Sequence, residues 1–111
     1  MKKFRKLILV DLDGVLNQYN GEYNPNTISP IKEGAKEFLE ELSKNCIIKI
    51  FTTRDKFLTQ KWLNENNLNK YEITNTKESA YLIIDDRCIC FNGDYNKTLE
   101  QIKTFKAYWK H

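Results

Sequence analysis

Apolar residues along the chain form short, nearly continuous runs that alternate with segments of helical periodicity. The clearest runs are KLILV (6–10), CIIKIF (46–51) and YLII (81–84). Runs of this length that are rich in Ile, Leu and Val are typical of strands covered on both faces of a sheet. Residues 71–74 and 88–91 predict two further short strands. The chain is thus expected to build a sheet from short, buried strands.

Segments between and after these runs carry the 3.6-residue period of amphipathic helices. Ser29 and Pro30 predict the start of the first helix, because a capping hydroxyl precedes proline at the first helical position. Asp55 and Asp94 are suited to cap the second and third helices. The positions expected to face the core are Ile31, Ala35, Phe38, Leu39, Leu42, Phe57, Leu58, Trp62, Leu63, Tyr95, Leu99, Ile102, Phe105 and Trp109. Aromatic residues at this spacing indicate packing rather than a ligand site.

Strands that alternate with helices of this length predict an α/β fold with a mainly parallel sheet. With 111 residues, the chain is long enough for one hydrophobic core, so a single domain over residues 1–111 is expected. Residues 17–29 (NQYNGEYNPNTIS) are rich in Asn, Gly and Pro. This segment is interpreted as a flap between the first strand and the first helix.

Polar and acidic side chains follow each core strand. Asp11 and Asp13 come after the first strand, Thr52 after the second, and Asp85 and Asp86 after the third. In open α/β sheets, ligands bind beyond the carboxyl ends of the strands. These side chains are therefore expected to meet on one rim of the sheet.

Four carboxylates on one rim would repel each other strongly. Two like charges ~4 Å apart repel by about 4 kcal/mol at an effective dielectric near 20, whereas a whole domain is stable by only roughly 5–15 kcal/mol. A hard divalent cation relieves this repulsion, and Mg²⁺ typically takes one or two carboxylates and leaves places for phosphate oxygens. Lys77, just before the third core strand, offers a second positive charge.

The composition fits an ordinary globular protein, with 41% hydrophobic residues, 30% charged residues and a formal net charge of +3. No apolar run approaches the roughly 18 residues that a membrane span needs. The basic residues at positions 2–6 lack aromatic stacking partners, so nucleic acid is not an expected partner. The three cysteines show no disulfide or zinc spacing, and Cys88 and Cys90 are expected to be buried on one strand face. A cytoplasmic protein without a membrane partner is expected.

The polar groups at the strand ends also carry a family resemblance. DLDGV (11–15), Thr52, Lys77 and the pair Asp85–Asp86 occur in an order that resembles the four motifs of the haloacid dehalogenase-like hydrolase superfamily. A lone D-x-D-G is often a plain turn, so the resemblance depends on the ordered set. It implies a three-layer Rossmann-like domain. It also implies phosphate chemistry, because an acid at position 13 separates the superfamily's phosphatases from its dehalogenases.

The resemblance gives each matching position a catalytic role. It implies that Asp11 is the nucleophile that forms an aspartyl-phosphate, and that Asp13 is the general acid and base. Thr52 would bind the phosphoryl oxygens through its hydroxyl. Lys77 would neutralise charge on the transferred group and on Asp11. Such a protein is expected to be a phosphatase, a phosphoric monoester hydrolase.

The resemblance further implies Mg²⁺ as the cofactor. The expected ligands are Asp11, the backbone carbonyl of Asp13, and Asp86. Asp85 is either an alternative ligand or a residue that orients bound water. Which member of the pair at 85 and 86 is the main ligand stays undecided at this point.

Neither interval between the motifs is long enough for the cap domain that many superfamily members carry, so a capless core is expected. Its open site suits a bulky substrate or a second copy of the chain, which would complete the wall as a homo-oligomer. The expected substrate is a phosphorylated sugar, a nucleotide or another small metabolite, ahead of a phosphoprotein or a nucleic-acid end. Candidate substrate contacts are Tyr19 and Tyr23 on the flap, and Thr53, Arg54 and Arg87 beside the motifs.

Two other function classes stay open. A phosphorylation-switched receiver domain also uses acids, a Thr and a Lys at strand ends with Mg²⁺. In a receiver, however, an acidic pair lies on the first strand and the phosphorylated Asp on a later one, an order that this chain does not follow. The second alternative is a catalytically silent module that keeps the metal or phosphate site.

Overall fold

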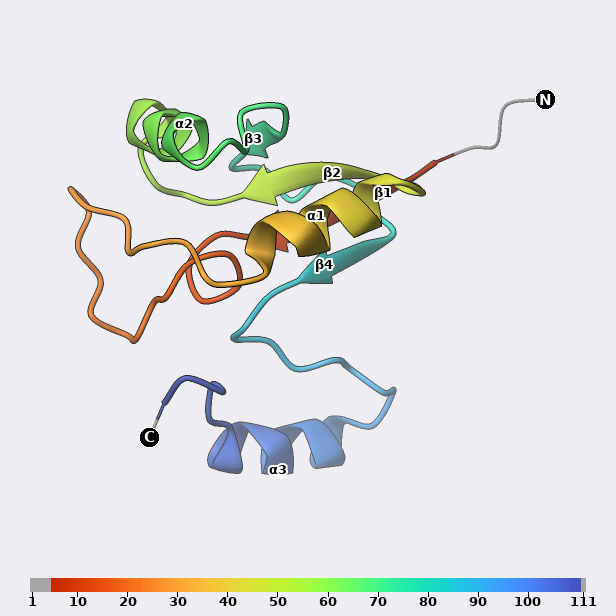
Figure 1. Cartoon of the computed structure of the whole chain (residues 1–111). Helices are drawn as coiled ribbons and strands as arrows, with labels where there is room; N and C mark the ends of the chain where they lie inside the picture. The colour runs from red at the N-terminus through yellow and green to blue at the C-terminus, as the bar shows by residue number, and fades with distance from the viewer. Residues whose placement is uncertain (1–4, 111) are drawn as a thin grey trace.

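The structure is a computed structural model that describes residues 5–110 (Figure 1). The elements in this range are β1 (Lys6–Asp11), α1 (Ala35–Ser43), β2 (Cys46–Phe51), α2 (Lys56–Glu65), β3 (Glu72–Thr74), β4 (Leu82–Ile84) and α3 (Tyr95–Thr104). The strands predicted at 6–10, 46–51, 71–74 and 81–84 are therefore confirmed. The strand predicted at 88–91 is wrong, because those residues have no regular structure.

The sheet is parallel throughout, with the strand order β3-β2-β1-β4. β1 ends level with its two neighbours, because Asp11 is paired with Phe51 of β2 and Val10 with Ile84 of β4. The residues that follow β2 and β4 consequently emerge beside the end of β1. The predicted α/β fold with a parallel sheet is confirmed, and it gathers the strand ends as expected.

One hydrophobic cluster joins the sheet to α1 and α2. Its buried members are Ile8, Val10, Leu12, Leu16, Ala35, Leu39, Ile48, Ile50, Trp62, Leu63, Leu68 and Tyr71. Full burial of one such aliphatic or aromatic side chain stabilises the fold by about 1.5–3 kcal/mol, so this cluster fixes the strand ends firmly. Phe57 was predicted to face the core, but its position on α2 leaves it 84% exposed.

The first helix begins later than the sequence predicts. Its N-cap is Gly34, which has a φ of 89°, and not Ser29. The reason is a competing hydrogen bond, in which the backbone N–H of Gln18 donates to the carbonyl of Pro30. Residues near Pro30 thus pair with the segment after β1 instead of winding into a helix. This pairing ties the segment after β1 to the residues that precede α1.

The caps of α2 and α3 are confirmed. Asp55 accepts a hydrogen bond from the backbone of Leu58, and Asp94 accepts one from the backbone of Lys97. α3 nevertheless stands apart from the sheet (Figure 1), and none of its residues is buried. The prediction that its apolar face packs into the core is therefore wrong. The exposed apolar residues of this segment are Tyr95, Leu99, Ile102 and Phe105.

The burial of the cysteines after β4 also differs from the prediction. Cys88 and Cys90 are exposed rather than buried, because no strand forms around them, and Cys46 is partly buried. Among the described residues, no helix has the length and apolar character needed to cross a membrane.

Candidate active site

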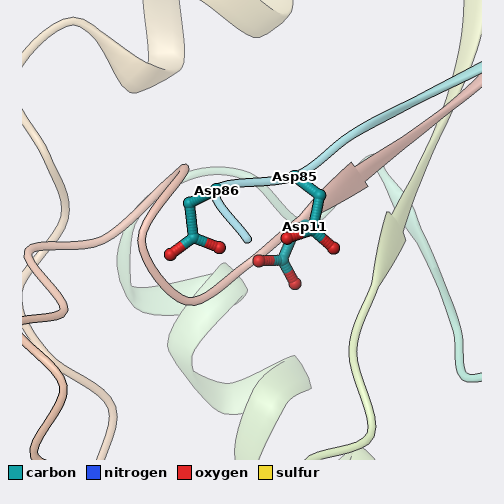
Figure 2. A group of neighbouring side chains, drawn as sticks. All are labelled: Asp11, Asp85 and Asp86. Carbon is teal, nitrogen blue, oxygen red and sulfur yellow. The ribbon is translucent and has the colours of Figure 1, made fainter. Parts of the chain in front are cut away.

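Three carboxylates meet at the carboxyl ends of β1 and β4. Asp11 is the last residue of β1, and Asp85 and Asp86 follow β4 directly. Carboxylate oxygens from all three residues lie within 4.8 Å of one another. Figure 2 shows the three side chains gathered at the end of β1. The structure thus brings together three of the four acids that the sequence placed on this rim, and we call them the acid cluster.

The acid cluster is electrostatically unfavourable in the protein alone. Burial, followed by the negative charges of Asp85, Asp86 and Asp13, raises the pKa of Asp11 from 3.8 to about 8. None of the influences on this pKa comes from a positive group of residues 5–110. In the protein alone, the protonated form of Asp11 is therefore favoured more than in an exposed aspartate. A bound cation would stabilise the ionised form of all three acids.

Asp86 supplies an observation that fits a bound cation. Its Oδ1 atom is buried without a hydrogen-bond partner, whereas Oδ2 accepts a hydrogen bond from Nε1 of Trp109. Buried polar atoms are nearly always paired, so an unpaired carboxylate oxygen beside two other acids points to a ligand. Mg²⁺ prefers carboxylate oxygens and keeps several water positions. The donor set and the unpaired oxygen therefore fit a hard divalent cation.

Asp13 is held by Arg54 and is not part of the acid cluster. Nε of Arg54 donates to Oδ2 of Asp13 at 2.8 Å, and Nη2 donates to Oδ1 at 3.1 Å. Nη1 donates to the flap carbonyls of Asn24 and Thr27, and the guanidinium lies 4.6 Å from the ring centre of Tyr23. Four of the five N–H donors of Arg54 are thus used within the fold. Arg54, a candidate substrate contact in the sequence, links Asp13 to the flap.

Asn17 organises the loop that follows β1. Its side chain is fully buried, and its Oδ1 accepts hydrogen bonds from the backbone of Gly14 and of Tyr19. Its Nδ2 donates to Oδ1 of Asp13 at 3.0 Å. The composition of residues 17–29 predicts a flap, but it does not predict this role of Asn17. The tendency of Asn side chains to close turns on nearby backbone groups is the signal that would have found it.

Thr52 lies at the end of β2 and is buried. Its Oγ1 accepts a hydrogen bond from the backbone of Arg54 at 3.1 Å, which leaves the hydroxyl hydrogen available to donate. Thr53, the next residue, is exposed. An open hollow of about 490 Å³ begins at Thr52, and its other lining residues are Arg54, Asp55, Lys56, Ile73, Thr74 and Asn75. The hollow extends the rim toward β3.

The remaining predicted site residues lie outside the acid cluster. Lys77 is exposed and takes part in none of the ion pairs found among residues 5–110. Arg87 is also exposed, and its backbone N–H donates to Oδ1 of Asp85 at 2.9 Å. Tyr19 is buried, and its ring meets the ring of Trp109 edge-on. Tyr19, a candidate substrate contact on the flap, is thus covered by the C-terminal segment.

The C-terminal segment was not predicted to reach the site. Trp109 was expected on the apolar face of the last helix, but α3 ends at Thr104. The following residues turn back, so that Nε1 of Trp109 donates to Asp86 and the hydroxyl of Tyr108 donates to the carbonyl of Gly14. A side chain beyond a helix end carries no periodic signal. Sequence patterns therefore could not reveal these contacts.

Comparison with known proteins assigns the chain to a family. The sequence model of the NLI interacting factor-like phosphatase family matches residues 6–108 of the 111-residue chain. The chain belongs to this family. NLI interacting factor-like phosphatases are haloacid dehalogenase-like, which confirms the resemblance found in the motifs and identifies the chain as a hydrolase of the phosphatase class.

A solved structure supports the fold of this NLI interacting factor-like phosphatase independently. It is described as the structure of the conserved protein coded by locus from Bacteroides thetaiotaomicron. It shares 22% sequence identity, each chain is covered over 95% of its length, and the TM-score is 0.60. At this identity the likeness shows the fold alone. None of the curated proteins matches the chain.

Proposed function

We propose that this NLI interacting factor-like phosphatase hydrolyses phosphoric monoesters in a Mg²⁺-dependent reaction, through an aspartyl-phosphate on Asp11. Family membership supports the phosphatase activity. The observation that carries the mechanism is the convergence of Asp11, Asp85 and Asp86, with one buried oxygen of Asp86 left unpaired. A divalent cation is the group that such a donor set accommodates.

The reaction has two steps. In the first, a carboxylate oxygen of Asp11 forms a bond to phosphorus while the bond to the leaving oxygen breaks, and Asp13 gives its proton to that oxygen. In the second, Asp13 takes a proton from a water molecule that attacks phosphorus, which releases inorganic phosphate and restores Asp11. Asp11, Asp86 and the carbonyl of Asp13 would hold the cation, Asp85 would contribute either an oxygen or a bound water, and the bound cation would supply charge neutralisation.

The surroundings of Asp13 are compatible with proton transfer. A carboxylate offers about four lone-pair sites. Oδ1 of Asp13 accepts from Asn17 and Arg54, whereas Oδ2 accepts only from Nε of Arg54. Asp13 forms an ion pair with Arg54 in the free protein, and Oδ2 keeps one site at which it takes up the proton that it donates in the first step. Arg54 fixes the orientation of the carboxyl group. Positioning of this kind supplies much of the rate of phosphoryl transfer.

Thr52 and Lys77 are assigned to the transferred phosphoryl group. The free hydroxyl hydrogen of Thr52 is suited to donate to a phosphoryl oxygen. Lys77 lies on the connection that leads to β4 and has no competing ion pair among the described residues. Its ammonium group is therefore available to neutralise charge. We assign the hollow beside Thr52, with the exposed Thr53, to the leaving group.

The proposed substrate is a phosphorylated sugar, a nucleotide or another small metabolite. The hollow is open to solvent. In a homo-oligomer, a second copy of the chain would form part of its wall. The free thiols of Cys46, Cys88 and Cys90 support a cytoplasmic location, where cysteines stay reduced.

Hydrolysis of para-nitrophenyl phosphate by the purified protein tests the proposal. We expect activity with Mg²⁺ and none after chelation. Asp11→Asn is expected to abolish turnover, and Asp13→Asn to slow it by about 10²–10⁴-fold. Asp94→Asn is the matched control, because Asp94 caps α3 and Asn is an equally good cap. Near-normal activity of Asp11→Asn would refute the mechanism.

The lifetime of a phosphorylated Asp11 separates the proposal from its alternatives. Rapid turnover supports a phosphatase. A phosphorylated form that persists for minutes indicates a receiver-like switch. Cation binding without any phosphorylation or hydrolysis indicates a silent binding module.

A further inference from the structure

Trp109 reaches the acid cluster from the far end of the chain. Its Nε1 donates to Oδ2 of Asp86. The indole ring packs edge-on against Tyr19, with ring centroids 5.2 Å apart, and it lies so close to Gly21 that a Cβ there would be 2.9 Å away. The indole is thus fixed by apolar contacts, and its one polar atom is directed to a residue that the proposed function assigns to the cation.

Gly14 completes the enclosure of Asp86. A Cβ at Gly14 would lie 2.1 Å from Oδ2 of Asp86 and 3.0 Å from Nε1 of Trp109. Gly14 also has a φ of 86°, which residues with side chains rarely adopt. The hydroxyl of Tyr108 donates to the carbonyl of this glycine. The C-terminal segment therefore holds both the carboxylate and the loop beside it.

The two oxygens of Asp86 are consequently in different environments. Oδ2 is occupied by the indole N–H, and Oδ1 is buried without a partner. Figure 2 shows one oxygen of Asp86 turned toward Asp11 and Asp85 and the other turned away. A carboxylate held at one oxygen cannot rotate freely, so the other oxygen keeps a fixed place.

We propose that Trp109 is a positioning residue of the cation site, an inference that rests on the proposed function. By occupying Oδ2 of Asp86, it fixes the carboxylate and leaves Oδ1 as the ligand oxygen. Hydrogen-bond partners of metal ligands orient those ligands, and their loss typically weakens metal binding about 10–100-fold. Trp109 therefore sets the cation affinity without touching the substrate.

The test compares the two tryptophans of the chain. Trp109→Phe removes the indole N–H and keeps an aromatic ring against Tyr19. Trp62→Phe is the control, because the N–H of Trp62 donates to the carbonyl of Ser29, outside the acid cluster. Electron paramagnetic resonance measures Mn²⁺ binding to the protein without any substrate. We expect about tenfold weaker binding by Trp109→Phe and an unchanged affinity for Trp62→Phe. Equal affinity of Trp109→Phe and the wild type overturns the inference.

A second measurement tests the inference without Trp109→Phe, for the case that this variant does not fold. The chain has two tryptophans, so all indole emission of Trp62→Phe comes from Trp109. Titration with Mg²⁺ is expected to change this emission at the concentrations at which the cation binds, because the charge of Asp86 is then shared with the cation. Constant emission while the cation binds overturns the inference.

The inference and the proposed function fail in different ways. A wild-type protein that binds no Mn²⁺ refutes the cation site, and the proposed function with it. If the wild type binds Mn²⁺ and hydrolyses the ester, and Trp109→Phe does both equally well, only the role of Trp109 is overturned.

Discussion

Removal of Arg54 is the most direct test of how the site is held together. The Arg54 side chain is 3% exposed, and its guanidinium makes four hydrogen bonds, two to Asp13 and two to flap carbonyls. Arg54→Ala leaves the side chain of Asp13, which is 15% exposed, with the amide of Asn17 as its hydrogen-bond donor. The negative charge of Asp13 is then largely uncompensated.

The expected loss in the free energy of unfolding follows from these contacts. Breaking a buried ion pair by removing one partner typically costs about 3–5 kcal/mol. Asn24 and Thr27 are exposed, so water can replace Arg54 at their carbonyls, and the lower end of about 3 kcal/mol is expected. Arg54→Lys keeps the charge but loses the two parallel hydrogen bonds to Asp13, and about half of that loss is expected. Both losses are large for a domain that is stable by about 5–15 kcal/mol.

Urea denaturation, followed by tryptophan emission, measures these losses. With a denaturant slope of about 2 kcal/mol per molar urea, a loss of about 3 kcal/mol lowers the midpoint by about 1.5 M. Lys61→Ala is a suitable control, because the contact of Lys61 with Glu65 is 4.0 Å long and both side chains are exposed. Its effect is expected to stay within about 0.5 kcal/mol.

A double-mutant cycle decides whether the loss comes from the ion pair. Asp13→Asn and Arg54→Ala are expected to couple by about 0.5–3 kcal/mol, because the two side chains contact each other directly. Strictly additive losses would refute the described pairing. So would a midpoint for Arg54→Ala no lower than that of Lys61→Ala.

Three further changes have defined outcomes. Gly14→Ala brings a Cβ to 2.1 Å from Asp86 and is expected to weaken Mn²⁺ binding at least about tenfold. Gly34→Ala is the control, because Gly34 has a similar φ of 89° but open space around it, so this change should affect stability alone. Because the pKa of Asp11 rises from 3.8 to about 8 on folding, the folded protein holds this proton more tightly than the unfolded chain. Without a divalent cation, the melting temperature should therefore fall as the pH rises from about 4 to about 8, and saturating Mg²⁺ should reduce this dependence. Lys77→Ala should lower kcat/KM for phosphate ester hydrolysis and leave Mn²⁺ binding unchanged. Unaltered Mn²⁺ binding by Gly14→Ala, a pH-independent melting temperature, or full activity of Lys77→Ala would contradict the respective expectation.

The strands of the sheet were predictable because a strand that is buried on both faces needs a continuous run of apolar residues, which is visible in the sequence. The runs at 6–10 and 46–51 became β1 and β2, and parallel alignment then placed Asp11 level with the end of β2. Residues 88–91 form a similar apolar run, but they do not form a strand. A strand also needs a hydrogen-bonding neighbour, and an apolar run does not specify one.

All three helices form, but the start of the first and the packing of the last were predicted wrongly for a related reason. An amphipathic period shows which face of a helix is apolar, but not what covers it. Leu99 and Ile102 of α3 fit the period and are each 57% exposed. At the start of α1, a local capping signal at Ser29 was overridden by the hydrogen bond between Gln18 and Pro30, which lie on two separate segments.

Which of the four acids belong to the acid cluster also depends on contacts that form only in the folded chain. Motif order placed four acids together, but Arg54, 41 residues from Asp13, withdraws that acid from the cluster. Three acids remain in the acid cluster, and a divalent ion bound there would compensate two of the three charges. Under the proposed function, the single negative charge that would remain favours the ionised form of Asp11 that a nucleophile needs. With Asp13 also unpaired, two negative charges would remain and favour the protonated form of Asp11. Under the proposed function, Arg54 would therefore support the reactivity of Asp11 through Asp13, without contact to the cation.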